Sequence, residues 1–341
     1  NAIGVLGVLQ HEVKYNGADI TAEEIEPILI STDPNFRPSD VEVGGDGALY
    51  VTDWHNALIG HMQHNMRDPN RDHEHGRIYR VTYEGRDLVK PAKMKGKPIT
   101  DVCQNFFSST DSTRYRARLE LSGRGGDEIT REVGGFAEAL NPKNASADRD
   151  EAQALLECLW VFEEQRVQNV DLLGKVFQAD EPRVRAAAIR TLGHWGEINP
   201  EIAGWQSTLQ AASRDESALV RAEALKAAVA FKGLSAAEVI FEVATRPTDP
   251  ELDTVLAYAK SKISADALVR DAIASGTPLS KAAMAYSLLN ASVTDLLKLE
   301  HSEAVYEAIL SRQNVPASAM RDSLNGLAGF QKVKPLSLAL N

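Results

Sequence analysis

The sequence predicts an α+β fold in two parts, with β-strands before residue 98 and helices after it. Short apolar runs separated by tight turns fill the first part, and Ala-rich amphipathic runs fill the second. Similar helical segments recur at a spacing in the mid-thirties, which is typical of an α-solenoid. We therefore predict a β domain over 1–98 and a helical-repeat domain over 99–335 of the 341 residues.

Composition excludes several classes of function. The net charge of -11 argues against a nucleic-acid partner, because phosphates require a basic surface. No apolar run approaches the ~20 residues of a membrane span. Cys103 and Cys158 are too few for a disulfide framework, and neither lies in the Cys-x-x-Cys-His motif that holds haem. No signal peptide is recognisable, and we expect the chain to be a piece of a longer protein.

The first part has the pattern of β-propeller blades. Strands are predicted over 8–15, 26–31, 38–43, 48–52 and 77–82. Turns at 16–19 and 44–47 contain the Gly and Asp residues that tolerate the positive φ angles of a hairpin. Because short strands joined by tight turns are typical of a propeller blade, we predict a partial propeller of the last one to two blades.

Blade geometry brings distant segments together. The segment before the first strand of a blade and the loop between its second and third strands lie on the same face of the disc. A blade that begins at Pro38 therefore places Arg37 at the same mouth as the long loop 53–76. Five of the eight histidines lie in this loop, between His55 and His75. Long loops held between strands commonly carry the functional residues of a sheet protein.

Three kinds of side chain in and near this loop have functional potential. Imidazoles at short spacing suit a transition metal, whereas carboxylates suit calcium. Guanidinium groups bind carboxylates bidentately. The candidate catalytic residues are His61 and His73, the candidate cofactor-binding residues are Arg37, Asp53, His55, Arg71 and Arg77, and the candidate metal ligands are His64, Asp72 and His75.

Structural roles for the same residues stay open. The histidines could instead hydrogen-bond to the loop backbone, since a long loop needs internal partners for its polar groups. The arginines could form salt bridges to Asp68 or Asp72. Asp53 could cap the loop backbone, or it could fix the tautomer of His55 or of His61.

The second part repeats one helical layout. An N-capping Asp is expected at Asp180, at Asp215 and at Asp249. In the first two copies it precedes a Val-Arg pair and an Ala-rich run, a layout similar to HEAT-type repeats. We expect the arginines of these pairs, Arg185 and Arg221, to form a polar ladder inside the solenoid.

Two predictions concern the boundaries of the helical part. Gly-rich and Asn/Pro-rich stretches predict that residues 123–150 form a loop or insertion. Near the end of the chain, Pro316 is expected to open one more helix.

The chain also resembles a known family. The resemblance is carried by Phe36-Arg37-Pro38-Ser39-Asp40-Val41, by the run from Asp46 to Trp54, and by the loop that ends in His75-Gly76-Arg77-Ile78-Tyr79-Arg80. These segments resemble bacterial membrane-bound dehydrogenases whose propeller is similar to glucose/sorbosone dehydrogenases. In that group, HEAT-like repeats follow the propeller, and a haem-binding cytochrome c domain commonly follows them. The likeness is strongest over 33–100.

The resemblance implies a C-terminal fragment of an exported, periplasmic, quinoprotein-like sugar or alcohol dehydrogenase. Pyrroloquinoline quinone and calcium would bind at the propeller mouth, with a histidine as base and Arg37 holding an anion. Electrons would pass to a cytochrome c outside this chain, which contains no haem motif. We expect the fragment alone to be inactive.

A function of another class is the alternative. In it, the chain is a non-enzymatic scaffold whose helical repeats bind a protein or a polysaccharide. The concave surface of a solenoid is the usual binding surface in such proteins.

Overall fold

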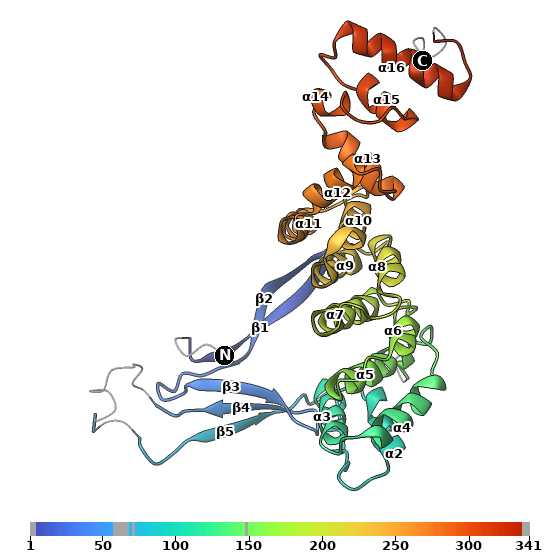
Figure 1. Cartoon of the computed structure of the whole chain (residues 1–341). Coiled ribbons are helices and arrows are strands. Elements are labelled where there is room, and N and C mark those ends of the chain that lie inside the picture. Colours follow the sequence, from blue (N-terminus) through green and yellow to red (C-terminus); the bar gives the residue numbers. More distant parts are fainter. Residues whose placement is uncertain (1–4, 57–67, 70–71, 147–148, 336–341) are drawn as a thin grey trace. The chain divides into compact units, whose positions relative to one another are not determined.

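The computed structural model describes residues 5–56, 68–69, 72–146 and 149–335 (Figure 1). The chain divides into two compact units, Asn1–Asp180 and Glu181–Asn341. The described strands all lie in the first unit, and the described helices run from Ile99 through both units. The boundary between compact units therefore falls inside the helical part of the chain.

A two-stranded hairpin opens the first unit. β1 (Gly7–Asn16) pairs with the antiparallel β2 (Asp19–Ile30), and Gly17 takes a positive φ of 65° in the turn. β2 begins well before the strand predicted at 26–31. Most side chains of this hairpin are exposed, so its polar first half gives no apolar alternation that would mark a strand.

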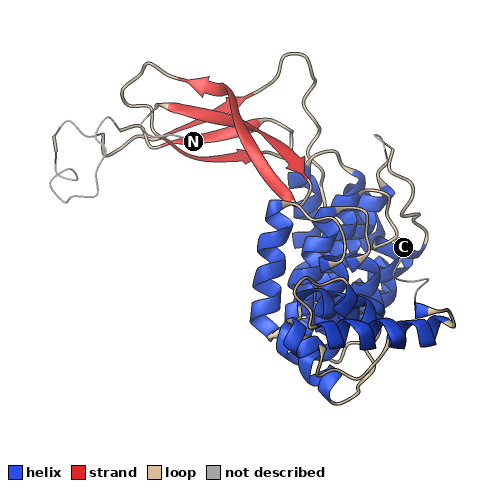
Figure 2. Ribbon diagram, turned by 90° about the horizontal axis from the view of Figure 1, so that it is seen from above, coloured by secondary structure: helices blue, strands red, loops and turns tan. Residues whose placement is uncertain are grey.

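A three-stranded antiparallel sheet follows, with the order β3-β4-β5 (Figure 2). Its strands are β3 (Pro38–Val43), β4 (Leu49–Asp53) and β5 (Arg77–Val81), as the sequence predicts. Within the described residues, the strands form these two small open sheets.

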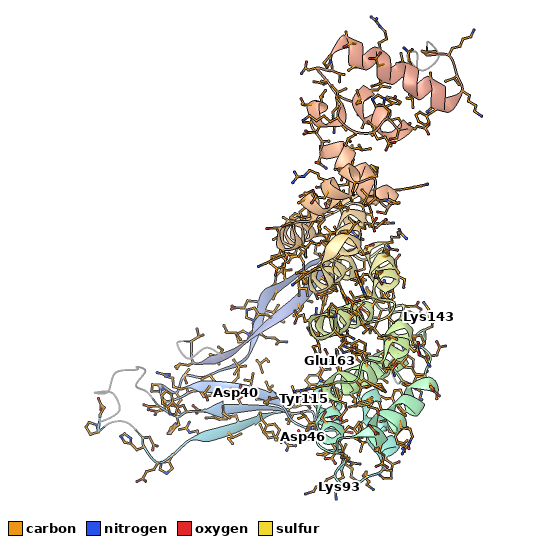
Figure 3. All side chains as sticks on the ribbon, viewed as in Figure 1. Asp40, Asp46, Lys93, Tyr115, Lys143 and Glu163 are labelled. Atoms are coloured by element: carbon orange, nitrogen blue, oxygen red, sulfur yellow. The ribbon has the colours of Figure 1, made fainter. Side chains whose placement is uncertain are left out.

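The turn between β3 and β4 is held by one carboxylate. Asp46 accepts hydrogen bonds from the backbone N–H of Ala48 at 3.1 Å and from the hydroxyl of Tyr50 at 2.9 Å, and it forms an ion pair with Arg80 of β5. Burial raises the pKa of Asp46, but these bonds outweigh burial and lower it to about 2. The side chain of Asp46 (Figure 3) therefore connects the turn to both strands that follow it, β4 and β5.

Short helices complete the first unit. They are α2 (Ile99–Cys103), the 3-10 helix η1 (Gln104–Phe107), α3 (Asp111–Ser122), α4 (Asp127–Glu138), α5 (Glu151–Glu164) and α6 (Val170–Val176). Cys103 and Cys158 are both buried free thiols. Burial raises the pKa of Cys103 to about 12 and raises that of Cys158 as well.

The prediction of a loop over 123–150 is wrong for α4. Ile129, Val133 and Ala137 recur every four residues and are all buried, which is the pattern of an amphipathic helix. Gly134 and Gly135 lie in the middle of this helix and lower its intrinsic helix propensity. Burial of the apolar stripe outweighs that local cost.

The second unit is a stack of helices in two layers. α7 (Pro182–Ile198), α9 (Ala218–Phe231) and α11 (Pro250–Ile263) pack side by side in one layer. α8 (Trp205–Ser213), α10 (Gly233–Ala244) and α12 (Ala265–Ala274) pack in the other (Figure 1).

The stack continues with α13 (Lys281–Asn290), α14 (Val293–Leu296), α15 (Glu303–Leu310) and α16 (Ala317–Gln331). Pro316 precedes α16, as predicted. In the part of the chain that the structure describes, no helix combines the length and the apolar character needed to cross a membrane.

The expected Asp caps are confirmed at only one of three positions. Asp249 caps α11, and its carboxylate accepts the N–H of Leu252 at 2.8 Å. The prediction that Asp180 caps α7 is wrong. Glu181 is the N-cap of α7, and Pro182 occupies the first turn. Asp215 is also wrong, since its carboxylate lies two residues before the N-cap of α9 and binds an arginine of the preceding repeat.

The polar ladder expected for Arg185 and Arg221 is confirmed. Arg185 of α7 binds both carboxylate oxygens of Asp215, each at 2.8 Å. Arg221 of α9 donates to the backbone oxygens of Asp215 and Glu216, and also to that of Pro247 at 2.8 Å, just before α11. Each arginine is nearly buried and bonds to the loop that precedes the next helix of its layer.

We predict that Arg221→Met destabilises the solenoid strongly. The substitution keeps an apolar stem but leaves three backbone carbonyls without a donor, which should lower the free energy of unfolding by about 2–4 kcal/mol. Urea denaturation followed by circular dichroism measures this loss. Arg183→Met is the matched control on the same layer, because the Arg183 side chain is 58% exposed and its ion pair with Glu181 is local. Equal losses of unfolding free energy in the two variants would contradict a stabilising role for the Arg221 hydrogen bonds.

Candidate functional site

Three strand ends meet at one edge of the β3-β4-β5 sheet. Pro38 is opposite Asp53, and Asp53 is opposite Arg77 in the strand register. The Asp53 carboxylate is 2% exposed, and its Oδ1 accepts the backbone N–H of Arg37 at 2.7 Å and that of His55 at 2.8 Å. The predicted convergence of Arg37 with the start of the 53–76 loop is therefore observed. Asp53 binds loop backbone, as in the structural alternative.

His55 and Arg77 lie side by side at this edge. His55 adopts a left-handed φ of 53°, which turns the chain sharply after β4. Arg77 Nη2 lies 3.0 Å from His55 Nε2, and Arg77 Nη1 donates to Asp33 at 2.8 Å and to the Tyr79 hydroxyl at 3.1 Å. The Tyr79 and Asp33 bonds raise the pKa of Arg77. Asp72 Oδ2 lies 3.6 Å from the same Nε2, so this nitrogen of His55 is close to both a guanidinium and a carboxylate.

Asp72 organises the chain just before β5. Its Oδ1 accepts the backbone N–H groups of Glu74 and His75, both at 3.0 Å, and its Oδ2 lies 3.0 Å from Nδ1 of His75. The N–H of Glu74 leads the bonds that lower the pKa of Asp72 to about 2. His75 is 72% exposed, and His73 is exposed as well. The carboxylate proposed as a metal ligand is thus occupied by backbone and imidazole donors.

The described residues at this edge do not assemble a quinone or calcium site by themselves. The Arg37 side chain is 7% exposed, and its Nη1 donates to the Phe36 carbonyl at 2.9 Å. Calcium takes about six to eight oxygen ligands. Asp53 Oδ2 is a buried oxygen without a hydrogen-bond partner among the described residues, but its Oδ1 is already used twice.

The other predicted site residues add no ligand to those described at the sheet edge. His61, His64 and Arg71 lie outside the described residues. Within the described ranges, no three His, Cys, Asp or Glu side chains are grouped so as to hold a metal ion.

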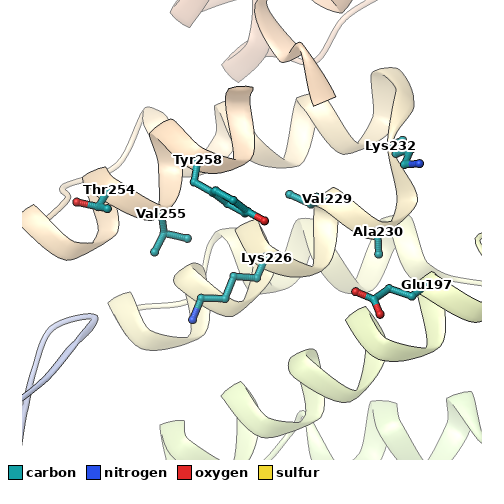
Figure 4. A pocket seen from close by; sticks show the side chains of 8 residues that line it. All are labelled: Glu197, Lys226, Val229, Ala230, Lys232, Thr254, Val255 and Tyr258. Carbon is teal, nitrogen blue, oxygen red and sulfur yellow. The ribbon is translucent and has the colours of Figure 1, made fainter. Parts of the chain in front are cut away.

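A second candidate site lies on the solenoid. A groove of about 710 Å³ runs across α7, α9 and α11 (Figure 4). Val229, Ala230 and Val255 form its apolar part. Tyr258 extends from α11 toward α9, and its side chain is among the exposed large apolar groups, at 51%.

Charged groups lie at the two ends of this groove. Glu197 of α7 and Lys232, just after α9, lie at one end, and the amino group of Lys226 lies at the other (Figure 4). Lys226 and Arg190 share the buried carboxylate of Glu223, at 3.1 and 2.8 Å. Two cations share one anion there, so that end keeps a net positive charge. The groove therefore combines an apolar centre with charged ends, of which the Lys226 end is positive.

The sequence gives little signal for several of these residues. Asp33 pairs with Arg77 across 44 positions, and no local pattern connects them. For Tyr258 a signal does exist, because an aromatic residue lies on the polar face of an amphipathic helix between Thr254 and Lys262. An exposed aromatic at such a position often marks a binding surface.

We predict that the Asp72 carboxyl titrates with a midpoint of about 2, against 3.8 for an ordinary Asp. Because the folded pKa is depressed, the stabilisation is complete above pH ~4 and is lost as the pH falls toward 2. Carbon-detected NMR of the side-chain carboxyl measures the midpoint. In His75→Ala the midpoint should rise only part of the way, since both backbone N–H bonds remain. A wild-type midpoint near 3.8 would contradict this geometry.

Two families match parts of the chain. Residues 6–85, which include both sheets, match a domain of unknown function (DUF7133). Residues 170–259 match HEAT repeats, and this range includes α6 to α10 and most of α11. No curated protein sequence is significantly similar to the chain. The helical repeats are thus HEAT-like and form a helical scaffold.

Proposed function

We propose that this chain binds a protein partner through the groove on α7, α9 and α11. The observation that carries the proposal is an exposed, partly apolar groove on the helices that match HEAT repeats. Stacked helical repeats create extended surfaces that bind proteins, because each repeat presents equivalent positions to the same side. No covalent chemistry is needed for this function.

The groove suggests the chemistry of the partner. Tyr258 supplies a large, rigid aromatic surface of the kind that dominates binding energy at protein interfaces. Val229 and Val255 would receive an apolar side chain of the partner. Glu197 would then face a basic group, and the cationic end at Lys226 an acidic one. The partner segment is therefore apolar at its centre and carries charged groups at its ends, with an acidic group facing Lys226.

We predict that Tyr258→Ala weakens partner binding by about 2 kcal/mol, the loss typical of an interface hot spot. A partner captured by cross-linking is first identified by mass spectrometry, then purified and titrated by calorimetry. Tyr115→Ala is the matched control, because Tyr115 is also 51% exposed and lies in the other unit. Glu197→Lys should weaken binding as well. Equal affinity of wild type, Tyr258→Ala and Glu197→Lys for the partner would overturn the proposal.

A second candidate function rests on the sheet edge. We propose, as the alternative, that the edge contributes to the mouth of a quinoprotein-like sugar or alcohol dehydrogenase in a complete propeller. The convergence of Arg37, Asp53, His55 and Arg77 supports this, as does the buried Asp53 Oδ2. In this alternative His61 or His73 is the base, a cytochrome c accepts the electrons, and the protein is periplasmic.

The two candidates differ in their response to cofactor. If the edge is part of a quinone site, pyrroloquinoline quinone with calcium should raise the melting temperature of the full-length protein, because a ligand that binds only the folded state stabilises it. His73→Ala should reduce that shift. An unchanged melting temperature with quinone and calcium favours the scaffold function alone.

A further inference from the structure

A cavity of about 580 Å³ lies in the second unit, and it shares α11 with the groove but none of the groove's lining residues. It is lined by the end of α11, by α12, by the second half of α13 and by the residues that lead into and follow α14. This volume is within the range of about 300–1,000 Å³ that is typical of small-molecule sites.

The charges in this cavity are not balanced. Lys260 pairs with Asp266 at 3.3 Å, and Lys298 pairs with Asp295 at 3.4 Å. Arg270 of α12 also lines the cavity. Among the described residues its guanidinium makes no hydrogen bond and no ion pair within 4 Å, and its charge acts at longer range on the Asp295 carboxylate. One guanidinium is therefore available to a ligand, while the other two cations are already neutralised.

The ion pairs limit the charge that a ligand can carry. The Ser292 hydroxyl, which is 2.6 Å from Asp295, and then Lys298 lower the pKa of Asp295. Burial acts against the charge of Lys260, but a hydrogen bond of 2.9 Å to the Tyr286 hydroxyl and the Asp266 carboxylate raise its pKa. Both ion pairs thus persist at neutral pH. A ligand with one negative charge matches the remaining cation.

Aliphatic side chains form one wall of the cavity, beside the polar Tyr286, Ser287, Asn290 and Ser292. Ile273, Ala274, Leu288 and Leu299 contribute aliphatic surface. The wall formed by the end of α13 is fixed by Arg312, which donates to the backbone oxygen of Leu288 at 2.8 Å. The cavity thus has a rigid apolar wall next to an unpaired guanidinium.

We propose that this cavity binds a small organic monocarboxylate with an apolar body. Arg270 binds the carboxylate, because the planar guanidinium fork matches the two oxygens of this group. The aliphatic wall contacts the apolar body. This site is independent of the groove on α7, α9 and α11, and its occupation requires no protein partner.

The test uses the full chain with phenylacetate as the probe and the neutral phenylacetamide as its isosteric control. Calorimetric titration should show saturable binding of phenylacetate with a Kd of ~1 mM or tighter, and at least about tenfold weaker binding of the amide. Arg270→Gln should weaken phenylacetate binding about tenfold or more by removing the charged donor. Ala274→Trp, at an exposed position of the lining, should abolish binding by filling the cavity.

Arg321→Gln is the matched control, since Arg321 lies in α16 and likewise has no ion pair among the described residues. It should bind phenylacetate as wild type does, and circular dichroism should show every variant folded. The proposal is overturned if phenylacetate shows no saturable binding, if the amide binds as tightly, or if Arg270→Gln keeps the wild-type Kd.

Discussion

The helical repeats depend on buried guanidinium groups that bond from one helix pair to the next. Arg185 reaches the Asp215 carboxylate, and Arg221 reaches the carbonyl of Pro247. A cation is stable in a protein interior only where its donors have partners, so these bonds fix the position of each inter-helix loop. The loops in turn set the start of α9 and α11, and hence the groove between them.

In the first unit, buried carboxylates connect separate segments in the same way. Glu157 of α5 is 2% exposed and lies between Arg114 and Arg118 of α3, with Gln153 donating at 2.8 Å. In the three-stranded sheet, the Asp53 carboxylate accepts the backbone N–H of Arg37, just before β3, and that of His55, just after β4. In each case one buried charge joins segments that are far apart in sequence, and removal of one partner would leave the other unsatisfied.

Whether a charge is already paired separates structural from functional residues in this chain. At the sheet edge, Arg77 and Asp72 use their polar atoms on neighbouring groups, which limits what they offer to a ligand. On the solenoid, Tyr258 is exposed in a groove, and Arg270 has no ion pair or hydrogen bond within the described chain. The exposed apolar and charged groups that are available to a ligand therefore lie on the helical repeats. The histidine-rich loop nevertheless gives the stronger signal in the sequence.

Local periodicity and turn chemistry in the sequence determined the strands β3 to β5, the Val-Arg repeats and the convergence of Arg37 with Asp53. These features depend on residues a few positions apart, or on a strand register that alternation already specifies. Only the tertiary structure decided which Asp caps a helix, that 127–138 is helical, and that Asp33 reaches Arg77. It alone decided that Arg270 lines a cavity. Those outcomes depend on packing between distant segments, where burial outweighs local preference and no short pattern records which side chains will meet.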